Sequence, residues 1–316
     1  MTSPASPSAG RLAVAYLGPI GTFTEQALHT QPDLRNADLR AMTSIPDVLN
    51  SVADGLSSIG FVPIENAIEG TVNLTLDTLA FDLDLLIQRE VIIDISLNLM
   101  APPNTALGDL KRVVSIPVAT AQCWKFIHAN LPGVRVEAAN STAEAAELVA
   151  RDRDGYTAAI APARSAEVYG LTILAPDIED HPENKTRFVA VAQRGVPRPT
   201  GHDKTSIVVF QRADVPGSLL AILQEFAARS INLSKLESRP TKTSLGDYCF
   251  IIDLDGHIAD ELLTDALRAV HAKQARVKFL GSYPAAGDHG PAVREEVQSS
   301  WRAANDWISA LRAQIV

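Results

Sequence analysis

Cysteine is scarce in this chain of 316 residues, which holds only Cys123 and Cys249, far apart in the sequence. Two distant cysteines form neither a disulfide framework nor a paired-cysteine zinc site. The seven histidines are scattered, and none belongs to a His-Glu-x-x-His motif. We therefore expect no metal site.

Basic residues are also in the minority, since 28 Lys and Arg stand against 37 Asp and Glu, a formal net charge of −9. This balance argues against a nucleic-acid surface, which needs a basic stripe. It leaves an anionic small ligand open, because the local field of a pocket can oppose the net charge.

Long apolar runs are missing as well. The most apolar stretch, 91–100, is interrupted by Asp94 and Asn98 and falls short of the roughly 20 residues that span a bilayer. Residues 1–10 lack the basic start and apolar centre of a signal peptide. We expect a protein that acts in the cytoplasm, without membrane partners.

The pattern of apolar residues divides the chain, whose length is typical of about two domains. Across 12–194, short β-branched runs alternate with helical patterns, which predicts an α/β fold with mostly parallel sheets. Thr22 with Glu25, and Ser141 with Glu144, have the spacing of capping boxes at helix starts. Breakers at 195–201 then mark a boundary.

The region after this boundary has a different order. Strands are predicted at 205–211, 232–239, 248–254 and 277–282, and helices at 217–229 and 260–271. This βαββαβ order is the ferredoxin-like arrangement. A last helix over 292–316 would present an apolar seam, which serves either subunit contact or the core of the chain itself: Val293, Val297, Trp301, Ala304, Ile308, Leu311 and Ile315.

Three polar segments follow or begin predicted strands of the first region. The segment GPIGTF at 18–23 suits a tight turn or an anion cradle at a helix start, and it is no nucleotide-binding loop. In PIEN at 63–66, Glu65 and Asn66 follow a buried strand, either as ligand contacts or as turn residues. In NKTRF at 184–188, Arg187 and Thr186 either bind a carboxylate and donate a hydroxyl proton, or merely start an edge strand.

These segments together resemble the prephenate dehydratase family, in order, across 12–284. The matching stretches are GPIGTF at 18–23, PIEN at 63–66, STAEAA at 141–146, YGL at 169–171, TRF at 186–188, GSL at 217–219 and ESRP at 237–240. The resemblance implies a two-lobed α/β catalytic module like type-2 periplasmic binding proteins over 11–195, an ACT regulatory domain over 204–284, and the terminal helix over 292–316.

The family resemblance also implies a function and its residues. The expected reaction converts prephenate to phenylpyruvate, water and carbon dioxide in phenylalanine biosynthesis, without a cofactor, in a monofunctional homodimer or homotetramer. The catalytic residues implied are Thr186, Asn66, Glu65 and Gln122. The substrate-binding residues implied are Arg187, Phe188, Thr22, Ser115 and Ser141. Allosteric phenylalanine is expected at Gly217, Ser218, Leu219, Leu220, Glu237, Ser238, Arg239 and Pro240.

Some positions depart from the family pattern. The family often has Ser-His-Pro-Gln where this chain has SIPV at 115–118, Asn140 stands where some members carry an acid, and GSLL at 217–220 replaces Gly-Ala-Leu-Val. Two alternatives stay open: an arogenate dehydratase, whose substrate has an amine in place of a keto oxygen, and a non-catalytic amino-acid-sensing protein.

Overall fold

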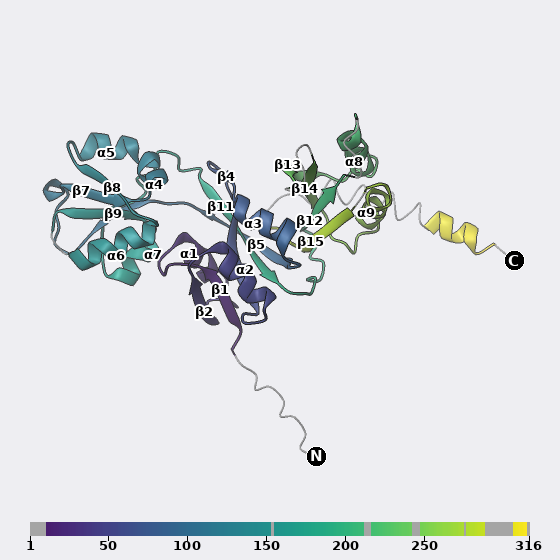
Figure 1. Ribbon diagram of the computed structural model, residues 1–316, viewed down its shortest axis with the longest axis horizontal. Helices are drawn as coiled ribbons and strands as arrows, with labels where there is room; N and C mark the ends of the chain where they lie inside the picture. The colour runs from purple at the N-terminus through teal and green to yellow at the C-terminus, as the bar shows by residue number, and fades with distance from the viewer. Residues whose placement is uncertain are drawn as a thin grey trace, which may run out of the picture. The chain divides into compact units, whose positions relative to one another are not determined.

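The computed structural model describes residues 11–152, 155–211, 216–241, 247–274, 276–287 and 306–314 (Figure 1). The chain divides into two compact units. Unit 1 comprises the residues up to Thr78 and Val91–Gln193, and unit 2 comprises Leu79–Glu90 and the residues from Arg194 onward. Among the described residues, no helix is long and apolar enough to cross a membrane.

Unit 1 has two lobes, each built on its own sheet (Figure 1). The sheet of lobe 1 has the order β2-β1-β3-β11-β5, with a short strand β4 beside β3. Its strands are β1 (Ala13–Leu17), β2 (Asp38–Met42), β3 (Ile59–Asn66), β4 (Gly70–Thr71), β5 (Leu86–Asp94) and β11 (Lys185–Ala192). Its helices are α1 (Phe23–His29), α2 (Ile45–Ala53) and α3 (Asn73–Asp77), followed by a π-helical turn at Thr78–Asp82.

Lobe 2 has a sheet of order β10-β6-β9-β7-β8. The strands are β6 (Asn98–Ala101), β7 (Arg112–Ser115), β8 (Arg135–Ala138), β9 (Thr157–Ala161) and β10 (Thr172–Ala175). The helices are α4 (Pro117–Gln122), α5 (Trp124–Asn130), α6 (Thr142–Asp152) and α7 (Ala163–Tyr169), with a 3₁₀ turn at Leu107–Asp109. The single helix expected near 119–131 is divided into α4 and α5 at Cys123.

Both sheets are mixed, which corrects the expectation of mostly parallel strands. Strand β1 runs parallel to β2 and β3, whereas β11 runs antiparallel to β3. In lobe 2, β7 is parallel to β8 and β9, and β6 is antiparallel to β9 and β10. The reversed strands β6 and β11 are those at which the chain enters lobe 2 and returns from it.

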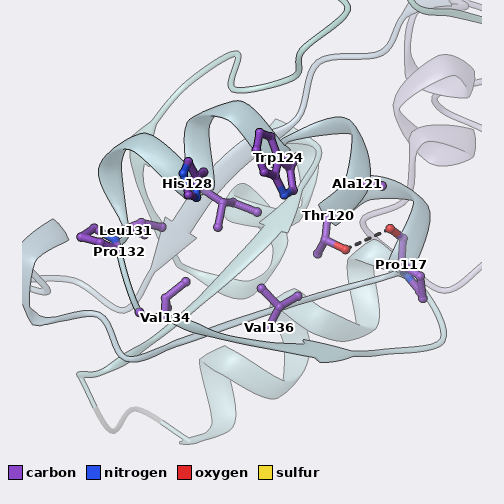
Figure 2. A pocket seen from close by; sticks show the side chains of 11 residues that line it. Pro117, Thr120, Ala121, Trp124, His128, Leu131, Pro132, Val134 and Val136 are labelled. Carbon is purple, nitrogen blue, oxygen red and sulfur yellow. Dashed lines mark hydrogen bonds between the residues drawn. The ribbon is translucent and has the colours of Figure 1, made fainter.

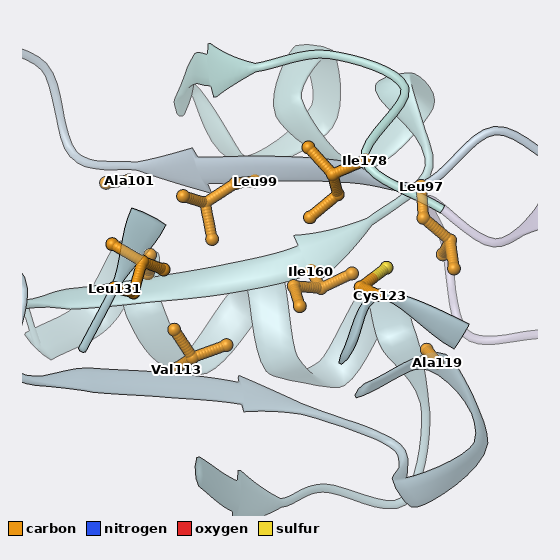
Figure 3. Packing of buried hydrophobic residues seen from close by; sticks show 10 residues of the cluster. Leu97, Leu99, Ala101, Val113, Ala119, Cys123, Leu131, Ile160 and Ile178 are labelled. Carbon is orange, nitrogen blue, oxygen red and sulfur yellow. The ribbon is translucent and has the colours of Figure 1, made fainter. Parts of the chain in front are cut away.

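The capping boxes predicted from the sequence start α1 and α6. The backbone N–H of Glu25 donates to Thr22 Oγ1, and that of Glu144 donates to Ser141 Oγ at 2.9 Å. Apolar side chains then fill each lobe. In lobe 2, Leu99, Val113, Ile160 and Cys123 gather at the sheet (Figure 3). Burial raises the pKa of the Cys123 thiol to about 12, with Glu179 and Asp180 adding to the shift, so this thiol is inert at neutral pH.

Unit 2 contains the predicted βαββαβ order. It runs β12 (Asp203–Phe210), α8 (Ser218–Ala227), β13 (Leu233–Pro240), β14 (Tyr248–Asp255), α9 (Glu261–Lys273) and β15 (Arg276–Pro284). The antiparallel sheet has the order β13-β14-β12-β15. Apolar residues of α8 and α9, including Ile222, Phe226 and Leu263, pack with strand residues into one core.

A segment from the middle of the first half of the chain, Leu79–Glu90, also belongs to unit 2. Lys204 Nζ lies 2.9 Å from both carboxylate oxygens of Glu90, whose side chain is 0% exposed. Lys278 Nζ donates to Leu83 O and contacts Asp84 at 3.0 Å. Strand β5 therefore begins in unit 2 and continues, from Val91, in the sheet of lobe 1.

The predicted terminal helix over 292–316 lies mostly outside the described residues. Residues 306–312 are helical, and Trp307, Ile308 and Leu311 are exposed on this helix. Val293, Val297, Trp301, Ala304 and Ile315 of the predicted seam are outside the described residues.

Candidate active site

Strands β3 and β11 bring two of the predicted catalytic residues together. Their register places Thr186 opposite Asn66 and Arg187 opposite Glu65. Asn66 Nδ2 donates to Thr186 Oγ1 at 2.8 Å. Since Thr186 is buried, this pairing fixes the hydroxyl at the end of two strands rather than on the open surface.

The orientation of the Asn66 amide is set by a local turn. Asn66 Oδ1 accepts hydrogen bonds from the backbone N–H groups of Ile68 and Glu69, both at 2.9 Å. This is the side-chain-to-backbone turn that asparagine favours after a strand. Because the oxygen is used there, the amide nitrogen points to β11. Thr186 Oγ1 thus acts as an acceptor, and its own proton is available for donation to a ligand.

Gln122 reaches this pair from lobe 2 through Asn184. Asn184 Nδ2 donates to Gln122 Oε1 at 3.2 Å, and Asn184 Oδ1 accepts from Asn66 Nδ2 at 2.9 Å. The sequence prediction did not include Asn184 among the site residues. The usable signal is its spacing: Asn184 directly precedes β11 and stands two positions before Thr186, and residues two apart in extended chain share a face.

The cation of the site, Arg187, is already paired. Arg187 Nη1 lies 3.1 Å from Glu65 Oε2, and the arginine side chain is only 10% exposed. Sequence reasoning expected Arg187 to bind a ligand carboxylate bidentately. In this structure an anion that reached Arg187 would have to compete with Glu65.

A second contact between the lobes involves the GPIGTF segment. Ser165 Oγ of α7 donates to Gly21 O at 2.7 Å, and Tyr169 OH donates to Ile20 O at 2.9 Å. Gly21 has a φ of +91°, and a Cβ there would lie 3.2 Å from Ser165 Oγ, so a larger residue would be strained. The segment thus joins lobe 1 to α7.

A buried carboxylate reinforces this junction. Glu25 Oε2 accepts from the Gly21 N–H, and Glu25 Oε1 pairs with Arg164 Nη2 of α7 at 2.9 Å. Burial works against the charge of Arg164, but the hydrogen bonds that the guanidinium donates to Glu25 and Glu167 outweigh it and raise the pKa of the guanidinium. Burial, followed by the charge of Glu25, raises the pKa of the Tyr16 hydroxyl. Tyr16 therefore stays neutral.

Two predicted substrate-binding residues are placed in the interior. Phe188 is stacked on Phe61 in the core of lobe 1, with ring centroids 5.7 Å apart. Ser115 is fully buried, and its hydroxyl donates to Ile160 O at 2.6 Å within the sheet of lobe 2. Each of these side chains packs within its own lobe.

A pocket of about 330 Å³ lies elsewhere in lobe 2 (Figure 2). The rings of Trp124 and His128 stack along its rim with centroids 4.9 Å apart, and Val134 and Val136 line it from the strand side (Figure 2). None of the predicted site residues lines it. The candidate site is therefore the Thr186 network and not this pocket.

Comparison with known proteins now decides the family. The model of the prephenate dehydratase family matches residues 14–196, and that of the ACT domain matches 205–272. A prephenate dehydratase of Mycolicibacterium vanbaalenii is 41% identical over 313 residues, covering 95% of this chain and 98% of the relative. The chain belongs to the prephenate dehydratase family.

Solved structures agree with the family assignment. A crystal structure of prephenate dehydratase from Arthrobacter aurescens in complex with L-Phe is 39% identical, with a TM-score of 0.85, and covers 95% of this chain and 99% of that chain. The Staphylococcus aureus prephenate dehydratase is 32% identical, with a TM-score of 0.75, over 86% and 99% of the two chains. The predicted fold, a two-lobed α/β module followed by an ACT domain, and the enzyme class, a carbon–oxygen lyase, are confirmed.

The predicted regulatory residues of this prephenate dehydratase family member lie in two segments of unit 2. Gly217 has a φ of +84° at the start of α8, Ser218 Oγ donates to Gln211 Oε1, Leu219 packs into the core, and Leu220 is exposed.

The second predicted segment is the end of the edge strand β13. There Glu237 and Arg239 are half-buried and 3.8 Å apart, whereas Ser238 and Pro240 are exposed. Half-buried charges on an edge strand discourage unspecific strand pairing.

The hydroxyls of Thr22 and Ser141 are engaged as helix caps, as described above. We expect Ser141→Ala to lower the free energy of unfolding by about 1 kcal/mol without changing KM. Ser44→Ala is the matched control, because Ser44 Oγ caps α2 in the same way, accepting from Asp47 N at 3.2 Å. Urea unfolding and steady-state kinetics on both variants test this expectation. A rise in KM confined to Ser141→Ala would instead support the substrate contact that the sequence predicts for that hydroxyl.

Proposed function

We propose that the Thr186 network is the site at which prephenate loses carbon dioxide and hydroxide to give phenylpyruvate. The observation that supports this is the hydrogen bond from Asn66 to Thr186 Oγ1, which directs the threonine proton outward. In the reaction the carboxylate C–C bond breaks, its electron pair enters the ring, and the C–O bond to the leaving hydroxyl breaks. The departing hydroxide takes up one proton from the solvent and becomes water.

Thr186 has a limited chemical task in this scheme. Aromatisation of the ring supplies the driving force, so the site must orient the substrate and stabilise charge that develops on the leaving oxygen. A threonine hydroxyl is a weak acid, and it acts here as a hydrogen-bond donor. Asn66 strengthens that donor, because a hydroxyl that accepts a hydrogen bond donates a stronger one.

The substrate carboxylates require positive partners. We assign one of them to Arg187, which would exchange Glu65 for the substrate on binding. Glu65 therefore lowers the affinity for substrate, because it competes with the substrate carboxylate for Arg187. Gln122 contributes from lobe 2 through its contact with Asn184, and the backbone at Thr22 and Ser141 offers the N–H groups of two helix starts.

The activity is tested by the ultraviolet absorbance of phenylpyruvate formed from prephenate, with arogenate assayed in parallel by release of phenylalanine. We expect kcat/KM to be higher for prephenate. A higher value for arogenate would make the chain an arogenate dehydratase. Binding of phenylalanine without turnover of either substrate would make it an amino-acid sensor.

We further propose that L-phenylalanine binds to paired ACT domains at Gly217–Leu220 and Glu237–Pro240, and that the enzyme is a homodimer or homotetramer. The support is the Arthrobacter aurescens relative, whose structure is a complex with L-Phe. Couplings between such sites are typically about 1–3 kcal/mol. Sedimentation and turnover should both respond to phenylalanine, and a ligand that leaves both unchanged contradicts the proposal.

A further inference from the structure

We infer that Asn184 is a positioning residue through which lobe 2 sets the Thr186 hydroxyl, an inference that rests on the proposed function. Three hydrogen bonds carry it. Asn184 donates to Gln122 of lobe 2, and Asn66 of lobe 1 donates both to Asn184 and to Thr186. A connected path of side chains thus runs from α4 to the catalytic hydroxyl.

The path has a fixed direction. Asn66 Oδ1 is held by two backbone N–H groups, so its nitrogen must be the donor to both Asn184 Oδ1 and Thr186 Oγ1. With its oxygen used in this way, Asn184 turns its own nitrogen to Gln122 Oε1. Rotation of the Asn184 amide by half a turn would set donor against donor and acceptor against acceptor. The buried amide has one satisfied orientation.

The backbone of Asn184 lies where the two connections between the lobes meet. Asn184 O accepts from the N–H of Ile95, which is on the connection leaving lobe 1 between β5 and β6. Asn184 itself is on the returning connection, between β10 and β11, and the N–H of Asp180 on that same connection donates to Gln122 O. A movement of lobe 2 would therefore alter the Gln122–Asn184 contact directly.

Because Asn184 is buried, loss of its contact with Gln122 should disturb the neighbouring side chains. Asn184 is 1% exposed, so water cannot replace a lost partner. An unsatisfied buried amide rotates to find another partner, and Asn66 Nδ2 is then left with Lys185 O, at 3.3 Å, as its acceptor besides Thr186 Oγ1. Thr186 Oγ1 then shifts relative to the leaving oxygen. Misplacement of a reacting group by about 1 Å can cost about 100-fold in rate.

A purely structural role for Asn184 predicts a different outcome. Loss of one buried hydrogen bond would lower stability but leave the kinetics of the folded fraction unchanged. A positioning role lowers kcat with little change in KM, because the interaction matters in the transition state and not in ground-state binding. The split between kcat and KM separates the two roles.

The experiment is a double-mutant cycle with Asn184→Ala, Gln122→Leu and the double variant, assayed on prephenate. We expect each single variant to lose roughly 10–100-fold in kcat, and the double variant to lose no more than the larger single loss, because both break one path. Losses that multiply overturn the inference, since Gln122 would then act on the substrate independently of Asn184. Asn130→Ala is the control, because the Asn130 amide is exposed and donates to Phe126 O within α5.

Two further measurements keep the inference decidable. Should Asn184→Ala not fold, Gln122→Glu is compared with Gln122→Leu: glutamate keeps the acceptor oxygen and should retain most of the rate, and equal losses overturn the inference. The second readout is the methyl NMR resonance of Thr186, which should shift in Gln122→Leu and not in Asn130→Ala. If the Thr186 resonance does not move in Gln122→Leu, the positioning role of Asn184 is wrong. If the wild-type chain does not turn over prephenate, only the proposed function is contradicted, because the NMR readout does not depend on turnover.

Discussion

Thr186→Val is expected to lower kcat on prephenate by about 10²–10³-fold, the usual cost of losing one hydrogen-bond donor to a developing oxyanion. Valine has nearly the shape of threonine and fits the same buried position, but it cannot donate a proton to the leaving oxygen. Asn66 would keep its hydrogen bond to Asn184 Oδ1. Phenylalanine binding in unit 2 should persist, because the substitution is confined to unit 1.

The matched control is Thr78→Val, at another buried threonine, whose hydroxyl donates to Leu74 O within one helical turn. This variant should lose about 1 kcal/mol of stability and retain kcat. Initial rates of phenylpyruvate formation and urea unfolding curves would be measured for both variants. Turnover that survives Thr186→Val at the wild-type rate removes Thr186 from the mechanism.

Lys204→Met should destabilise unit 2 by about 3–5 kcal/mol, because it removes the ammonium that pairs with the fully buried carboxylate of Glu90. The ammonium contacts both carboxylate oxygens, and its side chain is only 13% exposed, so solvent screens the pair weakly. Replacement of both partners, in Lys204→Met with Glu90→Leu, should recover most of the loss, since no charge then stays buried.

The comparison for this prediction is Lys185→Met, which breaks an exposed pair with Asp94 at 2.9 Å. Exposed pairs contribute about 0–1 kcal/mol, so its unfolding midpoint should hardly move. Guanidinium unfolding of all three variants measures the difference. Equal losses in Lys204→Met and Lys185→Met would contradict the role given to burial.

Local sequence signals predicted the parts of this fold that are decided locally. Thr22 and Ser141 begin helices because their oxygens satisfy backbone N–H groups three residues on, which depends on spacing alone. The βαββαβ order followed from periodicity in the same way. The direction of a strand leaves no such trace, which is why the sequence predicted mostly parallel sheets where both sheets are mixed.

In the candidate site too, the sequence predicted which residue types take part but not where each side chain lies. A motif names residue types, but their burial depends on packing with distant segments, so Phe188 and Ser115 could be placed in the interior only by the structure. Asn184 lay inside a segment that the sequence singled out, and its link to Gln122, 62 positions away, is a tertiary contact. The residue types in the motifs predicted the chemistry of the site, whereas the hydrogen bonds between distant residues could be found only in the structure.

The inclusion of Leu79–Glu90 in unit 2 bears on how this enzyme can be rebuilt. A catalytic fragment ending at the boundary 195–201 would retain Glu90 but lose Lys204, and it would retain Phe81 but lose Phe210, whose rings are 6.1 Å apart. Such a fragment would expose an apolar strand start and would lack the ammonium that pairs with the Glu90 carboxylate. A chimera with an ACT domain from another protein must therefore also replace the twelve residues Leu79–Glu90 with those of the donor. A single junction at 195–201 is not enough.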